Sequence, residues 1–386
     1  MSTTGRPAAL PTAALESAGF VRIVSRADGD ALAAVGIVAR ALAERETPFQ
    51  AAVRPTVGSR TDRVAAADDT TETLAIGAID GDAHRLAPSD RPTTLAACDL
   101  SRELGVEPDP VLALAGAFAA GVEPGAGETE HLLETARDRG LLERRPGVAI
   151  PTDDVADLAY STLCRAPWSG DSEATTESLA DLDFDSEDLD SEDLDDETWR
   201  RVGSLVALEA VGDEPATESA AHAIGRVLNP HATPEGPFAT VGGYADVLEA
   251  TALVAPGTGV ALAIGHDASE SALEAWREHG RRAHDALDGA STGRYDGLFV
   301  VGVDDGPVET VASVAARYRS PEPFVLAIGE GEAGIATLEA RSLGGPLEAV
   351  SRELEADYDV GRRRGYLQYD PEMDDSTIIA TVRDRL

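Results

Sequence analysis

Short apolar runs alternate with longer stretches of helical periodicity over residues 19–165. Runs of the first kind are typical of buried strands, and stretches of the second kind are typical of helices with one apolar face. The predicted strands are 20–24, 49–53 and 73–79, and the predicted helices are 31–44, 93–104, 110–120 and 128–139. This alternation favours an α/β domain with a mostly parallel sheet, in which ligands bind at the carboxyl ends of the strands.

The alternation resumes after residue 199 and predicts a second, smaller α/β domain at the C-terminus. Its predicted strands are 260–264, 295–303, 324–328 and 335–341, its predicted helices are 200–210, 217–228 and 269–287, and the tail 376–386 is a strand or a helix. The predicted domain boundaries are a tail over 1–18, a first domain over 19–168, a linker over 169–199 and a second domain over 200–386.

The linker contains a strongly acidic segment, residues 181–197, in which Asp-Ser-Glu-Asp-Leu occurs twice. Dense like charge with few apolar residues cannot form a core, so a solvated linker is the preferred interpretation. The alternative is an acidic peptide that binds a basic partner or mimics nucleic acid.

Composition changes how charge should be interpreted in this chain. It has 386 residues, 70 acidic against 32 basic, and a net charge of -38; it contains no lysine, so every basic residue is arginine. Such a balance indicates adaptation to a very salty cytoplasm, where concentrated salt screens the self-repulsion. The acidity therefore does not exclude nucleic-acid binding, and local arginine clusters carry more information than the total charge.

Cysteine usage and hydropathy add two expectations. Cys98 and Cys164 match no metal-ligand spacing and are expected to be buried and reduced. No apolar run is long enough to span a membrane and no signal region is found, so a soluble cytoplasmic protein without membrane contact is expected.

Candidate chemistry lies on the turn after the first predicted strand, where Asp28 and Asp30 flank Gly29. Carboxylates at i and i+2 on a tight turn can face one hard cation such as Mg²⁺ or Mn²⁺, and two such metals can hold a phosphodiester for attack by water. The alternative is structural, because Asp30 is well placed to cap the helix that follows and Gly29 suits the turn.

Order along the chain shifts the balance towards the metal interpretation. The stretch from Arg26 to Asp30 resembles the first motif of the DHH phosphoesterase superfamily, His-x-Asp-x-Asp-Gly, with Arg26 at the histidine position. Residues 151–171 resemble the connecting region of archaeal RecJ-like proteins, and residues 241–267 are similar to the start of their DHH-associated domain. The resemblance implies two domains, DHH and DHH-associated, with a cleft between them.

The departures from that pattern concern the other metal ligands. The chain has no His-His pair; Asp80 is the match for a further aspartate, with Asp82 and His84 as weak neighbouring ligands. Ala120 stands where the family has another aspartate, and the Gly-Gly-Gly-His turn is absent. The resemblance thus gives Asp28, Asp30 and Asp80 as a residual catalytic and metal set, expected to converge at the ends of adjacent strands.

The positive charge of Arg26 could affect the set of Asp28, Asp30 and Asp80 in two ways. Its positive charge would repel a cation, or it would pair with Asp28 and Asp30 so that a salt bridge replaces the metals. The cofactor is accordingly Mn²⁺ or Mg²⁺ if the protein is active, or none.

Two further stretches are candidates for substrate binding. Gly242 and Gly243 precede a predicted helix, whose N–H groups could receive a phosphate, although a plain turn is the alternative. Arg362, Arg363 and Arg364 form the densest basic cluster, beside tyrosines that could stack on bases. The alternative there is a solvated turn paired with nearby acids.

The resemblance implies a role in DNA replication or repair, with single-stranded DNA or RNA in the cleft and replication proteins of the GINS kind as partners. The chain is similar in this respect to the GINS-associated nuclease of archaea and to a eukaryotic helicase cofactor of the same superfamily. The missing ligands favour a nuclease site that is weakened or lost. The alternatives are an active Mn-dependent single-strand exonuclease or phosphodiesterase, and a structural protein that binds partners through its acidic segment.

Overall fold

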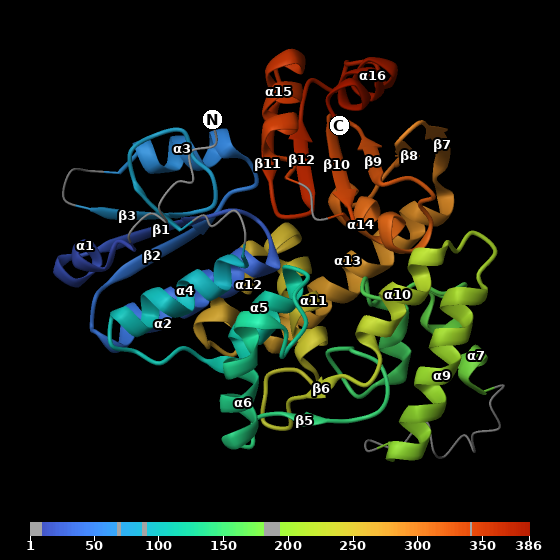
Figure 1. Cartoon of the computed structure of the whole chain (residues 1–386), viewed down its shortest axis with the longest axis horizontal. Helices are drawn as coiled ribbons and strands as arrows, with labels where there is room; N and C mark the ends of the chain where they lie inside the picture. The colour runs from blue at the N-terminus through green and yellow to red at the C-terminus, as the bar shows by residue number, and fades with distance from the viewer. Residues whose placement is uncertain (1–9, 68–70, 87–90, 181–193, 340–341) are drawn as a thin grey trace.

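The computed structural model describes residues 10–67, 71–86, 91–180, 194–339 and 342–386 (Figure 1). It confirms the α/β class: a four-stranded parallel sheet lies in the N-terminal part, and a separate six-stranded mixed sheet lies in the C-terminal part. Helices from both halves of the chain fill the space beside and below the two sheets (Figure 1).

The N-terminal sheet positions the Asp28 turn. Its strand order is β2-β1-β3-β4, and all of its pairings are parallel. The strands are β1 (Val21–Ser25), β2 (Phe49–Val53), β3 (Glu72–Ile76) and β4 (His84–Leu86). The first three coincide with predicted strands to within a few residues, and β4 was not predicted. Because β1 lies between β2 and β3, the turn that follows it opens at the middle of the sheet edge.

Helix α2 (Gly29–Glu44) follows that turn, and 13 of its 16 residues are buried. Its small residues allow close packing against helices from distant parts of the chain, α4, α5, α11 and α12. The other helices before residue 230 are α1 (Thr12–Ser17), α3 (Val57–Ala65), α4 (Thr93–Glu103), α5 (Pro110–Ala119), α6 (Glu130–Asp138), α7 (Ser172–Ala180), α9 (Asp196–Gly212) and α10 (Glu218–Val227).

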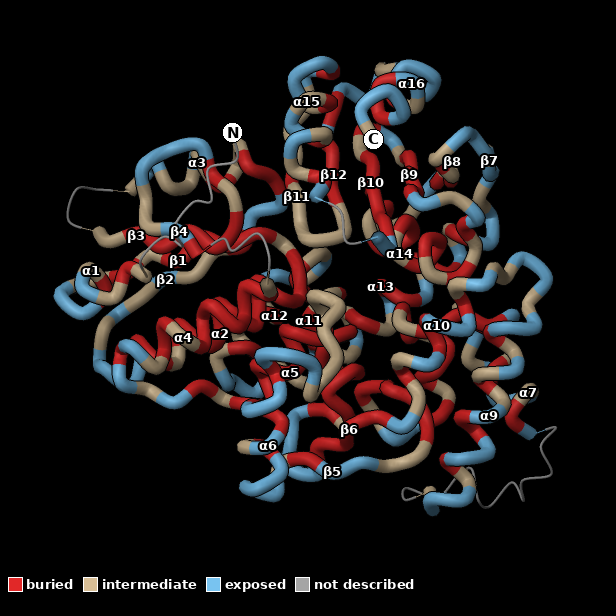
Figure 2. The backbone as a smooth tube through the Cα atoms, in the orientation of Figure 1, coloured by how far each residue is buried: buried red, intermediate tan, exposed pale blue. Residues whose placement is uncertain are grey.

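The later helices connect the two halves. They are α11 (Val241–Val254), α12 (Pro256–Ile264), α13 (Ser269–Gly289), α14 (Val308–Tyr318), α15 (Gly344–Leu354) and α16 (Asp375–Arg385). One apolar core runs continuously from Leu15 to Tyr366 and includes both expected buried cysteines (Figure 2). A second, smaller core lies between the C-terminal sheet and helices α15 and α16.

The C-terminal sheet has the strand order β11-β12-β10-β9-β8-β7. Only β8 and β9 are parallel; the remaining pairings are antiparallel. The strands are β7 (Ser291–Tyr295), β8 (Leu298–Gly302), β9 (Phe324–Gly329), β10 (Glu332–Thr337), β11 (Asp357–Val360) and β12 (Arg364–Gln368). A short antiparallel ribbon, β5 (Glu143–Arg144) with β6 (His231–Ala232), lies apart from both sheets.

The predicted strand 260–264 is wrong, since these residues form the second half of helix α12. Pro256 occupies the start of this helix, and Gly265 ends it with a left-handed φ of 96°. The buried positions Gly259, Leu262 and Ala263 follow helical rather than alternating spacing. A short apolar run has no periodicity that separates a strand from a buried helix, which explains the error.

Two other expectations concern the ends of the second half. The tail, for which a strand or a helix was expected, is the helix α16. The domain boundaries stay predictions, and residues 181–193 of the acidic segment lie outside the described part of the chain. None of the described helices combines the length and apolar composition needed to cross a membrane.

The close approach of α2 and α12 at Gly36 gives a first test of this packing. A Cβ at Gly36 would lie 2.5 Å from the carbonyl oxygen of Ala263, so Gly36→Ala must push two buried helices apart. We expect the free energy of unfolding to fall by ~1–3 kcal/mol, measured by denaturant unfolding in concentrated KCl. Gly257→Ala, on α12 with no atom within 4 Å of the new Cβ, is the matched control. That control should be neutral or stabilising by about 0.5–1 kcal/mol, and equal losses for both variants would contradict the packing.

Candidate functional site

The turn after β1 holds Asp28 and Asp30 in buried positions, 2% and 3% exposed. Asp28 is the N-cap of α2, where its Oδ1 accepts the backbone N–H of Ala31 at 2.6 Å. Asp30 lies in the first turn of the helix and accepts the backbone N–H groups of Thr93 and Thr94, both at 2.8 Å. It is thus Asp28, rather than Asp30, that caps the helix.

Arg26 and Arg364 neutralise these carboxylates from two sides. The Arg26 Nε lies 2.5 Å from Asp28 Oδ2, and its terminal nitrogen lies 3.7 Å from Asp30 Oδ2. Arg364, at the start of β12, lies 3.0 Å from the same Asp28 oxygen and also pairs with Glu249 of α11. The paired Glu249 accepts the backbone N–H of Gly29 at 2.8 Å. This network connects the turn after β1 to the C-terminal sheet.

The donor set around the turn does not fit a divalent cation. All four oxygens of Asp28 and Asp30 are already engaged by N–H, hydroxyl or guanidinium donors, and two full positive charges lie within reach of Asp28. A metal would have to displace Arg26 and Arg364 before it could use these oxygens. Over the described residues, no group of three histidine, cysteine or acidic side chains is arranged to hold a metal ion.

Asp80 does not converge on this turn, contrary to the expected geometry. It is exposed, on the loop after β3, and its backbone N–H donates to the Thr61 hydroxyl at 2.9 Å. Gly77, with a φ of 112°, lies between the end of β3 and this loop. The neighbours Asp82 and His84 line a separate surface cavity with Glu72. The catalytic and metal roles of these residues stay predictions.

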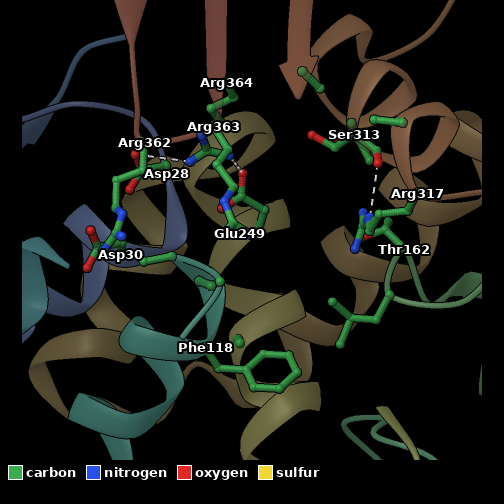
Figure 3. Close-up of a pocket in the computed structure, with 18 of the residues that line it drawn as sticks. Asp28, Asp30, Phe118, Thr162, Glu249, Ser313, Arg317, Arg362, Arg363 and Arg364 are labelled. Atoms are coloured by element: carbon green, nitrogen blue, oxygen red, sulfur yellow. Dashed lines mark hydrogen bonds and ion pairs between the residues drawn. The ribbon is translucent and has the colours of Figure 1, made fainter. Parts of the chain in front are cut away.

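A cavity of about 170 Å³ opens beside the paired carboxylates, between α5, α11, α14 and the C-terminal sheet (Figure 3). Its wall carries six arginines and four acidic residues; these are Arg26, Arg226, Arg317, Arg362, Arg363 and Arg364, and Asp28, Asp30, Asp246 and Glu249. The aromatic ring of Phe118 forms part of the wall, and the hydroxyl groups of Thr162, Thr310, Ser313 and Thr337 surround the space. All three arginines predicted as substrate-binding residues therefore reach one cavity.

Three of the cavity arginines are not used in ion pairs within the described chain. Arg317 donates its Nε to the carbonyl oxygen of Ser313 at 2.9 Å, and Arg362 and Arg363 contact no carboxylate there. Burial lowers the pKa of Arg317, and burial together with Arg226 and Arg362 lowers the pKa of Arg363. A lowered arginine pKa reflects a guanidinium that lacks water and lies near other positive charge, an arrangement that an anion would relieve.

The predicted glycine pair has a structural cause at both positions. Gly242 and Gly243 lie inside the first turn of α11 rather than before it. A Cβ at Gly243 would lie 2.2 Å from the backbone of Ile150 and Pro151, and one at Gly242 would lie 2.7 Å from Ala149. Close helix–backbone packing thus requires both glycines, and their role in phosphate binding stays a prediction.

Sequence reasoning missed Glu249, Arg226 and Arg317 as site residues. Each lies inside a helix, on α11, α10 and α14, far along the chain from Asp28. No local motif marks them. The signal that could have found them is their charge: a charged residue on a buried helix face needs a partner or a ligand.

The fold belongs to a known class. It is similar to the crystal structure of CDC45 from Entamoeba histolytica, with a TM-score of 0.59 over 96% of this chain and 97% of that one. Identity is 9%, so this likeness shows the fold alone. RecJ in complex with Mn²⁺ from Thermus thermophilus is a weaker match, with a TM-score of 0.49 at 14% identity over 97% of this chain and 53% of that one, and carries no weight for the assignment.

Sequence comparison identifies the family within that class. Uncharacterized protein rrnAC1427 of Haloarcula marismortui is 46% identical over 369 residues, which are 92% of this chain and 93% of that protein. Residues 290–384 match the model of the C-terminal domain of rrnAC1427. The chain therefore belongs to the rrnAC1427 family.

The double pairing of Arg364 can be tested by removing its charge. Arg364→Met leaves Asp28 and Glu249 without their shared partner, and we expect the free energy of unfolding to fall by about 3 kcal/mol. The control is Arg352→Met, since Arg352 is 72% exposed and pairs only with Glu348 along helix α15. It should change stability by less than ~0.5 kcal/mol. Denaturant unfolding measures the free energy of unfolding of both variants. A loss for Arg364→Met that is no larger than the loss for Arg352→Met would contradict the pairing.

Proposed function

We propose that this chain is a RecJ-like, nucleic-acid-associated protein of DNA replication or repair, in which single-stranded DNA or RNA binds at the arginine-lined cavity and the nuclease site is weakened or lost. The observation that carries the proposal is the cavity itself: guanidinium groups without carboxylate partners in the described chain lie beside carboxylates that are already paired. Phosphate oxygens match such guanidinium groups in charge and geometry.

The net charge of the whole chain restricts polyanion binding to a few places such as this cavity. A net charge of -38 repels polyanions from most of the surface, so binding depends on the few places where arginine dominates. In concentrated salt, exposed charges are screened within a few ångströms, whereas partly buried ones keep more of their interaction.

The pairing of Asp28 with Arg26 and Arg364 supports a nuclease site that is weakened or lost. Two guanidinium groups occupy the side of Asp28 from which a cation would approach, and Asp80 lies on an exposed loop. The likeness in fold to CDC45 and the motif-level resemblance to RecJ-like proteins support the replication or repair setting. By that resemblance, the protein partners would be replication proteins of the GINS kind.

Binding tests the proposal first. We expect the full chain to bind single-stranded oligonucleotides in KCl, and Arg317→Ala and Arg363→Ala each to weaken binding roughly tenfold through the loss of a charged hydrogen bond. The control is Arg281→Ala, because Arg281 is exposed on α13 and already paired with Glu278 and Asp285. Fluorescence anisotropy over a series of KCl concentrations measures the affinities. The absence of binding to DNA and RNA, or equal weakening by the control, would refute the proposal.

A nuclease assay tests the second part. Degradation of single strands in Mn²⁺ or Mg²⁺ is expected to be absent or very slow, and unchanged in Asp28→Asn/Asp30→Asn. Rapid degradation that this double variant abolishes, with folding verified by circular dichroism, would instead establish an active Mn-dependent exonuclease.

A further inference from the structure

A second cluster of positive charge lies outside the main cavity, around His231 on the β5–β6 ribbon. His231 is 5% exposed. A terminal nitrogen of Arg137 lies 3.3 Å from its Nε2, and a terminal nitrogen of Arg144 lies 3.3 Å from both ring nitrogens. Arg137 lies in the last turn of helix α6 and Arg144 pairs with His231 across the ribbon, so the fold itself brings the three side chains together.

Among its three side chains, this cluster has many donors and only one acceptor, the bare nitrogen of the neutral His231 ring. Within the described chain, neither Arg137 nor Arg144 contacts a carboxylate, although the protein has 70 acidic residues for 32 arginines. Burial, with the charges of Arg144 and Arg137, lowers the pKa of His231 to about 4, so the ring is neutral at neutral pH. A neutral imidazole has one bare nitrogen and one N–H. Since guanidinium groups only donate, they can serve the bare nitrogen, and the ring N–H is left without an acceptor among the described contacts.

A small cavity of about 60 Å³ lies next to this cluster and is lined by His231, Arg144 and Arg226, among others. Glu123, an acidic residue of its wall, is already paired with Arg226. Val241, which also lines the cavity, begins helix α11. The first N–H groups of a helix have no partner within the helix, and its dipole adds partial positive charge at that end. The cavity is therefore bordered by donors from a ribbon, a helix start and two arginines.

The two cavities are neighbours that share part of their walls. Phe118 and Arg226 line both, and the Arg226 guanidinium lies over the Phe118 ring, 5.4 Å from its centre. One terminal nitrogen of Arg226 is buried without a hydrogen-bond partner in the described chain. Its charge also contributes to the lowered pKa of Arg363 in the main cavity. Arg226 thus joins the arginines of the main cavity to those around His231.

We propose that Arg137, Arg144 and His231 form a second phosphate subsite, which binds the phosphodiester backbone of a single strand where it leaves the main cavity past Arg226. The proposal rests on the proposed function and deepens it, because it gives the path of the strand from the main cavity to a second site. A longer strand then gains contacts that a short one cannot make.

Strand length tests this subsite in the full chain. We expect oligo(dT) of about 16 nucleotides to bind more tightly than oligo(dT) of about 4, within the range of single-strand site sizes. Arg137→Gln/Arg144→Gln should remove that gain, roughly tenfold, and leave the short oligonucleotide unaffected. The slope of log K against log[KCl] for the long strand should become shallower by roughly 1.4, about 0.7 for each lost phosphate contact.

Arg139→Gln is the matched control, because Arg139 is exposed at the end of the same helix but lines a different cavity. An independent readout is the pKa of His231 by NMR, which should rise on addition of the long strand and not of the short one. Three results would overturn the subsite: a length gain that survives the double substitution, no length gain in the native protein, or a His231 pKa that the long strand does not change. In each case, binding of the short strand would still support the proposed function. Failure of both lengths to bind would overturn the proposed function and the subsite with it.

Discussion

The pairing of Asp28 with two arginines is the interaction on which the architecture of the site depends. Asp28 caps the first turn of α2, Arg26 directly follows β1 on the same connection, and Arg364 comes from the distant C-terminal sheet. A buried carboxylate in this position needs compensating positive charge, whether from a metal or from protein. Here the positive charge comes from two arginines of the chain itself. The contact of Arg364 that neutralises Asp28 therefore also joins the turn to the C-terminal sheet.

Some of the fold could be predicted because its signals are local. The strands on either side of β1, the helix after Asp28 and the α/β class follow from apolar periodicity and from the order of elements, and the structure agrees with them. The run 260–264 failed because five apolar residues between Pro256 and Gly265 suit a strand or a buried helix equally well, and only packing against α2 decides. Strands β4, β7, β11 and β12 carry too few apolar residues to be recognised alone.

Some residues of the candidate site could likewise be predicted from the sequence, and others could not. The motif resemblance put Arg26 at a histidine position, and its pairing with Asp28 was one of two expected outcomes. The position of Asp80 could not be predicted, because Asp80 lies on an exposed irregular loop after β3, where no periodic pattern fixes the side chains. Glu249 and Arg226 could not be found from sequence because their importance arises only when α10 and α11 pack beside a turn far away along the chain. Local sequence specifies the elements, whereas long-range packing selects the charged side chains that meet.

Every basic side chain that lines the main cavity is an arginine, and this also limits how the protein can be regulated. Guanidinium groups stay protonated over the physiological range of pH, so the charge that faces a bound strand cannot be changed by ordinary changes of cellular pH. Acetylation, which switches off positive charge at lysine, has no substrate side chain anywhere in a sequence without lysine. The affinity of such a cavity is therefore set by the surrounding ion concentration and by competing ligands. Control of this protein therefore cannot rest on protonation or acetylation of the basic side chains in this cavity.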